Sequence, residues 1–221
     1  MLEPDASFVG AYCERLGSPA FLAEPLNAAT NLAFILAAFI ALVAARGARR
    51  DPAILTLILL AALIGIGSFL FHTIPNRITV LADVLPIQAF ILTYVWLATR
   101  RYLGQPFWLS VGASAAFFLA SGIFVAAIGS RTLGGSVGYL PALVALVGFG
   151  IAIQRRGGEK DRHAARALFA AAAVFAVSLS MRTLDMPFCE PVPFGLHFGW
   201  HLLNAVVLAI LMLAAIRHQR G

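Results

Sequence analysis

Seven long apolar stretches follow one another along the chain, and each is long enough to cross a bilayer as one helix. A span needs about 20 mostly apolar residues to cross roughly 30 Å of hydrocarbon. Because lipid offers the backbone no hydrogen-bond partners, such segments must be helices or strands of a closed barrel. Their length and unbroken apolar character exclude barrel strands. The predicted spans are roughly 26–45, 53–73, 78–99, 107–128, 137–154, 164–182 and 195–216.

The composition agrees with a chain that lipid surrounds. Of the 221 residues, 61% are hydrophobic and 12% are charged, whereas soluble domains are about 45–50% apolar and about 25% charged. The net charge of +6 comes from basic residues in short gaps between apolar stretches, which indicates membrane topology signals rather than a nucleic-acid surface. We therefore predict an all-α membrane protein, a seven-transmembrane helix bundle. It forms one domain over 1–221, with 1–25 as an outer N-terminal segment.

The basic residues also predict the orientation, because cytoplasmic loops carry an excess of Lys and Arg. With the N-terminus outside and the C-terminus inside, twelve basic residues lie inside and four lie outside. The inner residues are Arg46, Arg49, Arg50, Arg100, Arg101, Arg155, Arg156, Lys160, Arg162, Arg166, Arg217 and Arg220. The outer residues are Arg15, Arg77, Arg131 and Arg182. The near absence of lysine and the abundance of alanine favour a GC-rich bacterial genome, and hence the inner (cell) membrane.

Four ionisable residues lie within or against the predicted spans, where a charge costs about 2.5–3.5 kcal/mol at the centre. They are His72, Asp83, His197 and His201. The predicted orientation places all four near the outer face, although it was obtained from loop charges alone. At 1.5 Å per residue, His197 and His201 lie roughly 3 and 9 Å below the start of the seventh span. Three helices therefore bring polar groups to one level.

The spacing of these residues favours a catalytic zinc site. His197 and His201 are four residues apart and share one helix face. Together with His72 they supply three ligands and leave a fourth position open, which is typical of catalytic zinc. Asp83 is then the candidate general base. Ser68, one turn below His72, is a candidate to orient water or to donate to an oxyanion.

Other interpretations of the same residues stay open. A single histidine in a helix is often only a packed polar residue. A serine-type triad of Ser68, His72 and Asp83 is also possible, but it leaves His197 and His201 unexplained. A retinal protein needs a lysine in the seventh span, which has none. A transporter site usually lies at the bilayer midplane, whereas this group lies toward one face.

At these residues the chain resembles the alkaline ceramidase family, a group of seven-helix membrane hydrolases related to the progestin and adipoQ receptors. The similar segments are Glu24-Pro-Leu-Asn27-Ala-Ala-Thr30-Asn31, Ser68-Phe-Leu-Phe-His72, Asp83, Arg182-Thr-Leu-Asp185-Met-Pro-Phe-Cys189 and His197-Phe-Gly-Trp-His201. The resemblance implies that His72, His197 and His201 bind Zn²⁺, that Asp83 acts as base and then acid, and that Ser68 assists at the oxyanion. The implied reaction hydrolyses the amide of ceramide, a lipid drawn from the bilayer. A lipid receptor with a mainly structural zinc is the alternative.

Two further expectations come only from this resemblance. Animal relatives bind Ca²⁺ through their N-terminal segment, and Glu14 and Glu24 match two of those ligands. Ala11 and Leu16 replace side chains that would carry oxygen, so the ligands for a full calcium site are incomplete. The family often links its N-terminal segment to the last outer loop. Cys13 and Cys189 could form this disulfide in an oxidising compartment, and two unpaired thiols are the alternative.

Overall fold

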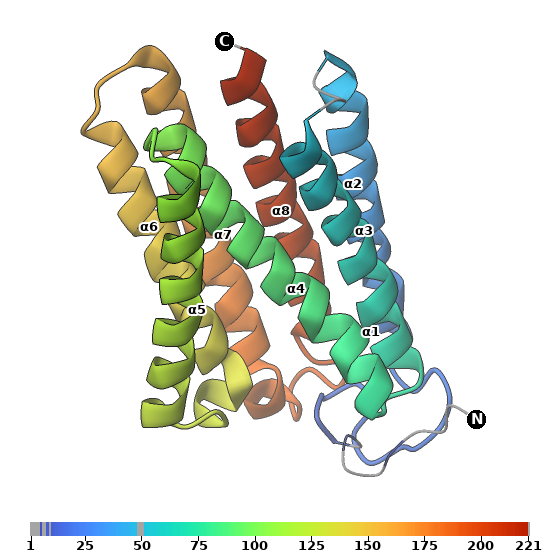
Figure 1. The fold of residues 1–221 in the computed structure, drawn as a ribbon. Coiled ribbons are helices and arrows are strands. Elements are labelled where there is room, and N and C mark those ends of the chain that lie inside the picture. The colour runs from blue at the N-terminus through green and yellow to red at the C-terminus, as the bar shows by residue number, and fades with distance from the viewer. Residues whose placement is uncertain (1–4, 6–7, 9, 48–50, 221) are drawn as a thin grey trace.

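The computed structural model describes residues 5, 8, 10–47 and 51–220, and it confirms the predicted seven-helix membrane fold. Seven helical segments in this part of the chain are long and apolar enough to cross a membrane. They run alongside one another as a bundle, with the N-terminal segment at one end and the C-terminus at the other (Figure 1). Arg49 and Arg50, which the orientation prediction counts as inner, lie outside the described residues. The architecture is that of a multi-pass integral membrane protein.

Eight α-helices build the seven spans, because two of them share the first span. Their bounds are α1 Pro25–Thr30, α2 Leu32–Ala44, α3 Pro52–Thr73, α4 Arg77–Leu97, α5 Phe107–Ile128, α6 Leu140–Gln154, α7 Glu159–Leu184 and α8 His197–Arg220. Short 3₁₀ segments lie at η2 Ala45–Gly47, η4 Thr132–Tyr139 and η5 Met186–Phe188, and a π-helical turn, η3 Ala98–Tyr102, extends α4.

The first span breaks at Asn31, where polar side chains compete for the helix carbonyls. The Thr30 hydroxyl donates to the carbonyls of Leu26 at 2.9 Å and Asn27 at 3.0 Å. The Asn31 amide also donates to the carbonyl of Asn27, at 2.9 Å. Such local bonds offer the backbone an alternative to the regular helix ladder. The result is a separate first turn, α1, at the end of the bundle that carries the N-terminal segment.

The sixth and fifth spans begin three or more residues away from their predicted starts. The sixth span begins at Glu159 rather than near 164, because Glu159 and Asp161 favour the positive end of a helix and extend it beyond the apolar stretch. The fifth span begins as an α-helix at Leu140 rather than near 137, after the 3₁₀ segment η4. Within η4, Leu133, Gly134 and Gly135 have positive φ angles that no α-helix contains.

Helix α3 begins at a cap that lies at the end of the bundle opposite α1. The Asp51 carboxylate accepts hydrogen bonds from the backbone N–H groups of Ala53 at 2.9 Å and Ile54 at 3.3 Å, and Pro52 starts the helix. Arg101 pairs with the same carboxylate at 2.6 Å. Burial alone would raise the pKa of Asp51, but Arg101 and the helix N–H groups hold it below its ordinary value.

Helices α3 and α4 approach each other most closely at Gly67, next to the candidate residues Ser68 and Asp83. A Cβ atom added at Gly67 would lie 1.9 Å from the backbone oxygen of Ala82. Only glycine allows this contact. The close approach places the Ser68 side of α3 against the Asp83 side of α4.

The Gly67→Ala substitution is expected to destabilise the bundle by about 1–3 kcal/mol, the usual cost of overpacking. The new methyl group would meet backbone, which cannot move aside as a side chain can. The free energy of unfolding in detergent measures the effect. Gly112→Ala in α5 is the matched control, since no described atom lies within 4 Å of its added Cβ. Equal stability of the two variants would show that α3 and α4 are not held at this distance.

Candidate metal centre

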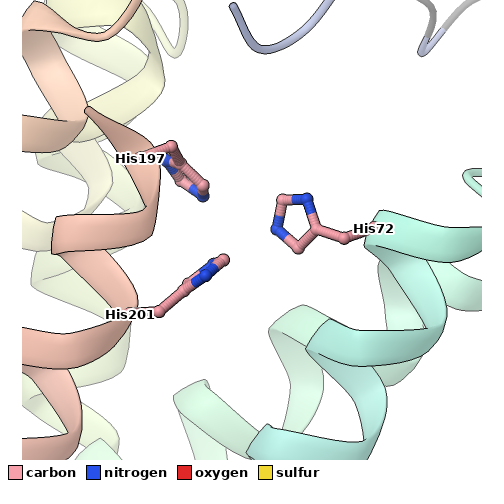
Figure 2. Close-up of side chains that lie close together, drawn as sticks. All are labelled: His72, His197 and His201. Atoms are coloured by element: carbon pink, nitrogen blue, oxygen red, sulfur yellow. The ribbon is translucent and has the colours of Figure 1, made fainter. Parts of the chain in front are cut away.

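His72, His197 and His201 come together as a possible metal site between α3 and the start of α8. One ring nitrogen of each histidine lies within 4.8 Å of the corresponding nitrogens of the other two. All three residues are buried, and their ring centroids are 4.7 to 5.2 Å apart. Figure 2 shows the two rings of α8 directed toward the ring of His72 across the gap between the helices. Three imidazoles in this arrangement suit a divalent zinc ion.

Unpartnered nitrogens support the same interpretation. Buried polar atoms almost always have a hydrogen-bond partner. The Nε2 of His72 and the Nδ1 of His197 are buried without one in the described part of the chain. A metal ion bound between the rings would satisfy such nitrogens through their lone pairs. The donor set therefore fits a metal.

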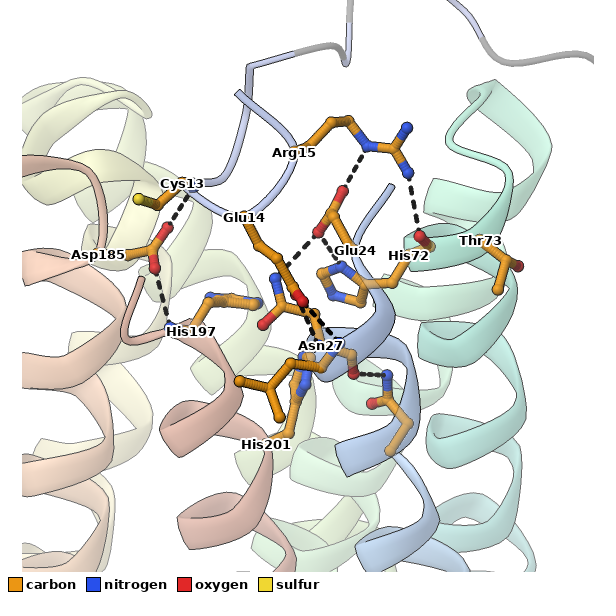
Figure 3. A network of polar contacts seen from close by, with 12 residues as sticks. Cys13, Glu14, Arg15, Glu24, Asn27, His72, Thr73, Asp185, His197 and His201 are labelled. Carbon is orange, nitrogen blue, oxygen red and sulfur yellow. Dashed lines mark hydrogen bonds and ion pairs between the residues drawn. The ribbon is translucent and has the colours of Figure 1, made fainter. Parts of the chain in front are cut away.

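Glu24 determines which nitrogen of His72 is available. The Nδ1 of His72 lies 2.5 Å from the Glu24 carboxylate, which also accepts from Arg15 at 2.6 Å and from the Asn27 amide at 3.1 Å (Figure 3). Burial would raise the pKa of Glu24, but the bonds from His72, Arg15 and Asn27 outweigh it, so the pKa is lowered. The ionised carboxylate accepts the Nδ1 proton, and Nε2 keeps its lone pair for a metal.

The tautomer of His201 is determined in a similar way by the first span. The Thr30 hydroxyl lies 3.0 Å from the Nδ1 of His201, and its own proton goes to the carbonyls of Leu26 and Asn27. The hydroxyl oxygen therefore accepts the Nδ1 proton of His201. The Nε2 of His201 is then the nitrogen left for a metal.

Asp185 positions the start of α8 and with it the two histidines. Its Oδ1 accepts from the backbone N–H groups of Leu196 at 2.7 Å and His197 at 2.9 Å, and its Oδ2 accepts from that of Cys13 at 2.9 Å. Gly195 has a φ of +69°, and a Cβ there would lie 2.2 Å from Asp185. Glycine is therefore required where the chain turns into α8. The ring of Tyr12 lies over His197, with 4.0 Å between centroids.

Ser68 and Asp83 line a cavity that opens beside the histidines. The same cavity, of about 300 Å³, is also lined by His197 and His201. The remaining lining is mostly apolar and extends to Tyr94 and Leu211. At 1.5 Å per residue, Asp83 and Tyr94 lie roughly 17 Å apart along α4. One leaflet is about half of the roughly 30 Å of hydrocarbon, so this length suits a lipid tail.

The calcium candidates of the N-terminal segment have protein partners. The two carboxylate oxygens of Glu14 accept from the backbone N–H groups of Leu26 at 2.6 Å and Asn27 at 2.8 Å, at the start of α1. Both oxygens of Glu24 accept hydrogen bonds from protein donors. Calcium binding stays a prediction that these contacts do not test.

A disulfide joins Cys13 to Cys189 in the structure. It connects the N-terminal segment to the loop before α8. Figure 3 shows Cys13 next to Asp185 and near His197. Four consecutive residues of the N-terminal segment therefore contact or support the histidine site. Tyr12 contacts His197, Cys13 is covalently tied, Glu14 caps α1, and Arg15 binds Glu24.

Sequence reasoning did not assign the supporting roles of Glu24, Thr30 and Asp185. All three lie in segments that resemble the ceramidase family, and the resemblance suggests Glu24 only as a calcium ligand. Glu24 and Thr30 flank the outer start of the first span, at the predicted level of His72, and Asp185 precedes the span that carries His197. Nothing in the sequence pairs each of them with a particular histidine or helix end.

Comparison with known proteins identifies the family of this chain. A search of curated proteins found no match. The family model described as Ceramidase matches residues 11–220, nearly the whole chain, including every residue of the histidine cluster. The chain therefore belongs to the ceramidase family, and this membership implies an amide hydrolase.

Proposed function

We propose that this protein is a zinc-dependent amidase of the membrane that hydrolyses ceramide or a related N-acyl lipid. The products would be a long-chain amine, a sphingoid base in the case of ceramide, and a fatty acid. The observation that carries the proposal is a cluster of three buried histidines. Two of them, His72 and His197, have a ring nitrogen without a hydrogen-bond partner in the described part of the chain. Two of the three, His197 and His201, line a long, mostly apolar cavity that Ser68 and Asp83 also line.

Each group has a defined part in the proposed reaction. Zinc held by His72, His197 and His201 would lower the pKa of a water molecule to about 7 and polarise the amide carbonyl. The Asp83 carboxylate would accept a proton from the attacking water and later pass it to the amine that leaves. The Ser68 hydroxyl would donate to the carbonyl oxygen as negative charge develops there.

The cavity supports a lipid as the substrate. Its apolar lining would hold one tail along α4 and α8 and would keep bulk water from the amide, while the second tail could remain in the bilayer. We propose that the site faces the outer side of the membrane, since twelve of the sixteen basic residues then lie inside. The bacterial inner membrane is the location that the arginine-rich composition favours.

Product analysis tests the proposal. Protein purified in detergent would be incubated with ceramides of several chain lengths, other N-acyl lipids and an ester analogue. We expect long-chain amine and fatty acid in equal amounts. Activity should disappear after chelation and return with Zn²⁺ but not with Ca²⁺ alone. Saturable lipid binding without any product would contradict the amidase and favour the receptor with a structural zinc.

A further inference from the structure

Arg15 is a fully buried cation in the outer N-terminal segment. Its side chain has 0% exposure, although a buried charge is costly unless it is paired and hydrogen-bonded. Its partners meet that need. Nε donates to Glu24 at 2.6 Å, and Nη1 donates to the carbonyls of Ser18 at 3.2 Å and Ala20 at 3.1 Å. Nη2 donates to the backbone carbonyl of His72 at 3.0 Å.

The contacts form a continuous path to the candidate metal ligand. Arg15 occupies one oxygen of Glu24, and the Nδ1 of His72 occupies the other (Figure 3). The guanidinium therefore holds the carboxylate from one side and the backbone of His72 from the other. Because its donors are planar and rigid, it restricts both groups at once.

We infer that Arg15 is a positioning residue of the metal centre, acting through Glu24 on His72. The guanidinium holds the Glu24 carboxylate in place, and the carboxylate orients the imidazole so that Nε2 faces the other two histidines. This inference rests on the proposed function, since it concerns how tightly the site holds zinc. The competing explanation is that Arg15 only fastens the N-terminal segment to the bundle.

Zinc affinity measured without any substrate tests the inference. Metal-free protein in detergent would be titrated with Zn²⁺ against a chromophoric chelator, and the Co²⁺ form would be followed by its absorption spectrum. Arg15→Ala should weaken Zn²⁺ binding about 10–100-fold, the usual effect of removing support from a ligand. It should also shift the Co²⁺ spectrum. If Arg15 only attached the N-terminal segment to the bundle, the spectrum would be unchanged.

Arg15→Lys should retain part of the affinity, because an ammonium can pair with Glu24 but cannot reach all four acceptors. It also keeps the test decisive if Arg15→Ala does not fold. Arg77→Ala is the matched control. Its side chain is 90% exposed and forms a 3.9 Å ion pair with Asp5, and such surface pairs contribute little. We expect wild-type affinity for this control.

A double-mutant cycle distinguishes positioning of His72 through Glu24 from attachment of the N-terminal segment to the bundle. If Arg15 acts through Glu24, the variant with both Arg15→Ala and Glu24→Gln should bind Zn²⁺ no more weakly than Glu24→Gln alone. Losses that multiply would indicate independent roles and would overturn the inference, as would wild-type affinity in Arg15→Ala. Wild-type protein that binds no zinc at the histidines would overturn the proposed function itself, so the two failures are distinguishable.

Discussion

Asp83→Asn is expected to lower kcat for amide hydrolysis by about 10²–10⁴-fold, the usual contribution of general acid–base catalysis. The side-chain amide of the new asparagine cannot accept a proton from water or return one to the leaving amine. Zinc content should stay at the wild-type value, because the candidate metal ligands are the three clustered histidines and Asp83 is not one of them. Steady-state kinetics with a fluorescent ceramide, together with metal analysis of the same preparation, measures both quantities.

Asp51→Asn provides the matched control for this variant. It makes the same chemical change in a carboxylate at the opposite end of the bundle, where Asp51 caps α3 and pairs with Arg101. Asparagine caps helices about as well as aspartate, so kcat should be unchanged. An Asp83→Asn protein with wild-type kcat would remove Asp83 from the chemistry.

His201→Ala should abolish both zinc binding and hydrolysis, a larger loss than the about 10–100-fold typical of a supporting residue. Two histidines would remain, too few for a catalytic zinc site with three protein ligands. Metal analysis after dialysis against a chelator and the product assay measure the two losses. His163→Ala is the control, since His163 is exposed and its ring contacts the Glu159 carbonyl of its own helix.

The same variant distinguishes a zinc-dependent mechanism from a serine-type triad mechanism. A triad of Ser68, His72 and Asp83 would not need His201. Metal-free His201→Ala protein that still released fatty acid would therefore contradict the zinc mechanism and favour the triad.

The fold was predictable because the bilayer imposes a simple constraint. Each apolar stretch must become a helix, so the seven spans follow from the sequence with small differences in their bounds. The differences arise where polar side chains act against the apolar pattern, through local hydrogen bonds or through the helix dipole. Thr30 and Asn31 break the first span, and Glu159 extends the sixth beyond its apolar part.

The histidine cluster was predictable for a similar reason. Ionisable residues are costly in lipid, so His72, His197 and His201 stood out, and loop charges placed them at one level. Their supporting contacts were not predictable. The bonds from Glu24 to His72 and from Thr30 to His201 depend on the angles at which distant helices meet, which no spacing in the sequence encodes.

Arg15 is the clearest example of a residue whose role could not be predicted from the sequence. In the sequence it is one of four basic residues of the outer segments, and its charge alone suggests exposure. Burial of its guanidinium is possible only because Glu24 and three carbonyls converge on it. That convergence becomes visible only when the N-terminal segment is placed over α1 and α3.

The most direct test of the central claim is an anomalous difference map, recorded at the zinc absorption edge from crystals of catalytically active protein. The account predicts one peak per chain, at about 2.0–2.1 Å from a ring nitrogen of each of His72, His197 and His201. Active crystals without a peak at these three rings, or with zinc bound elsewhere, would contradict it.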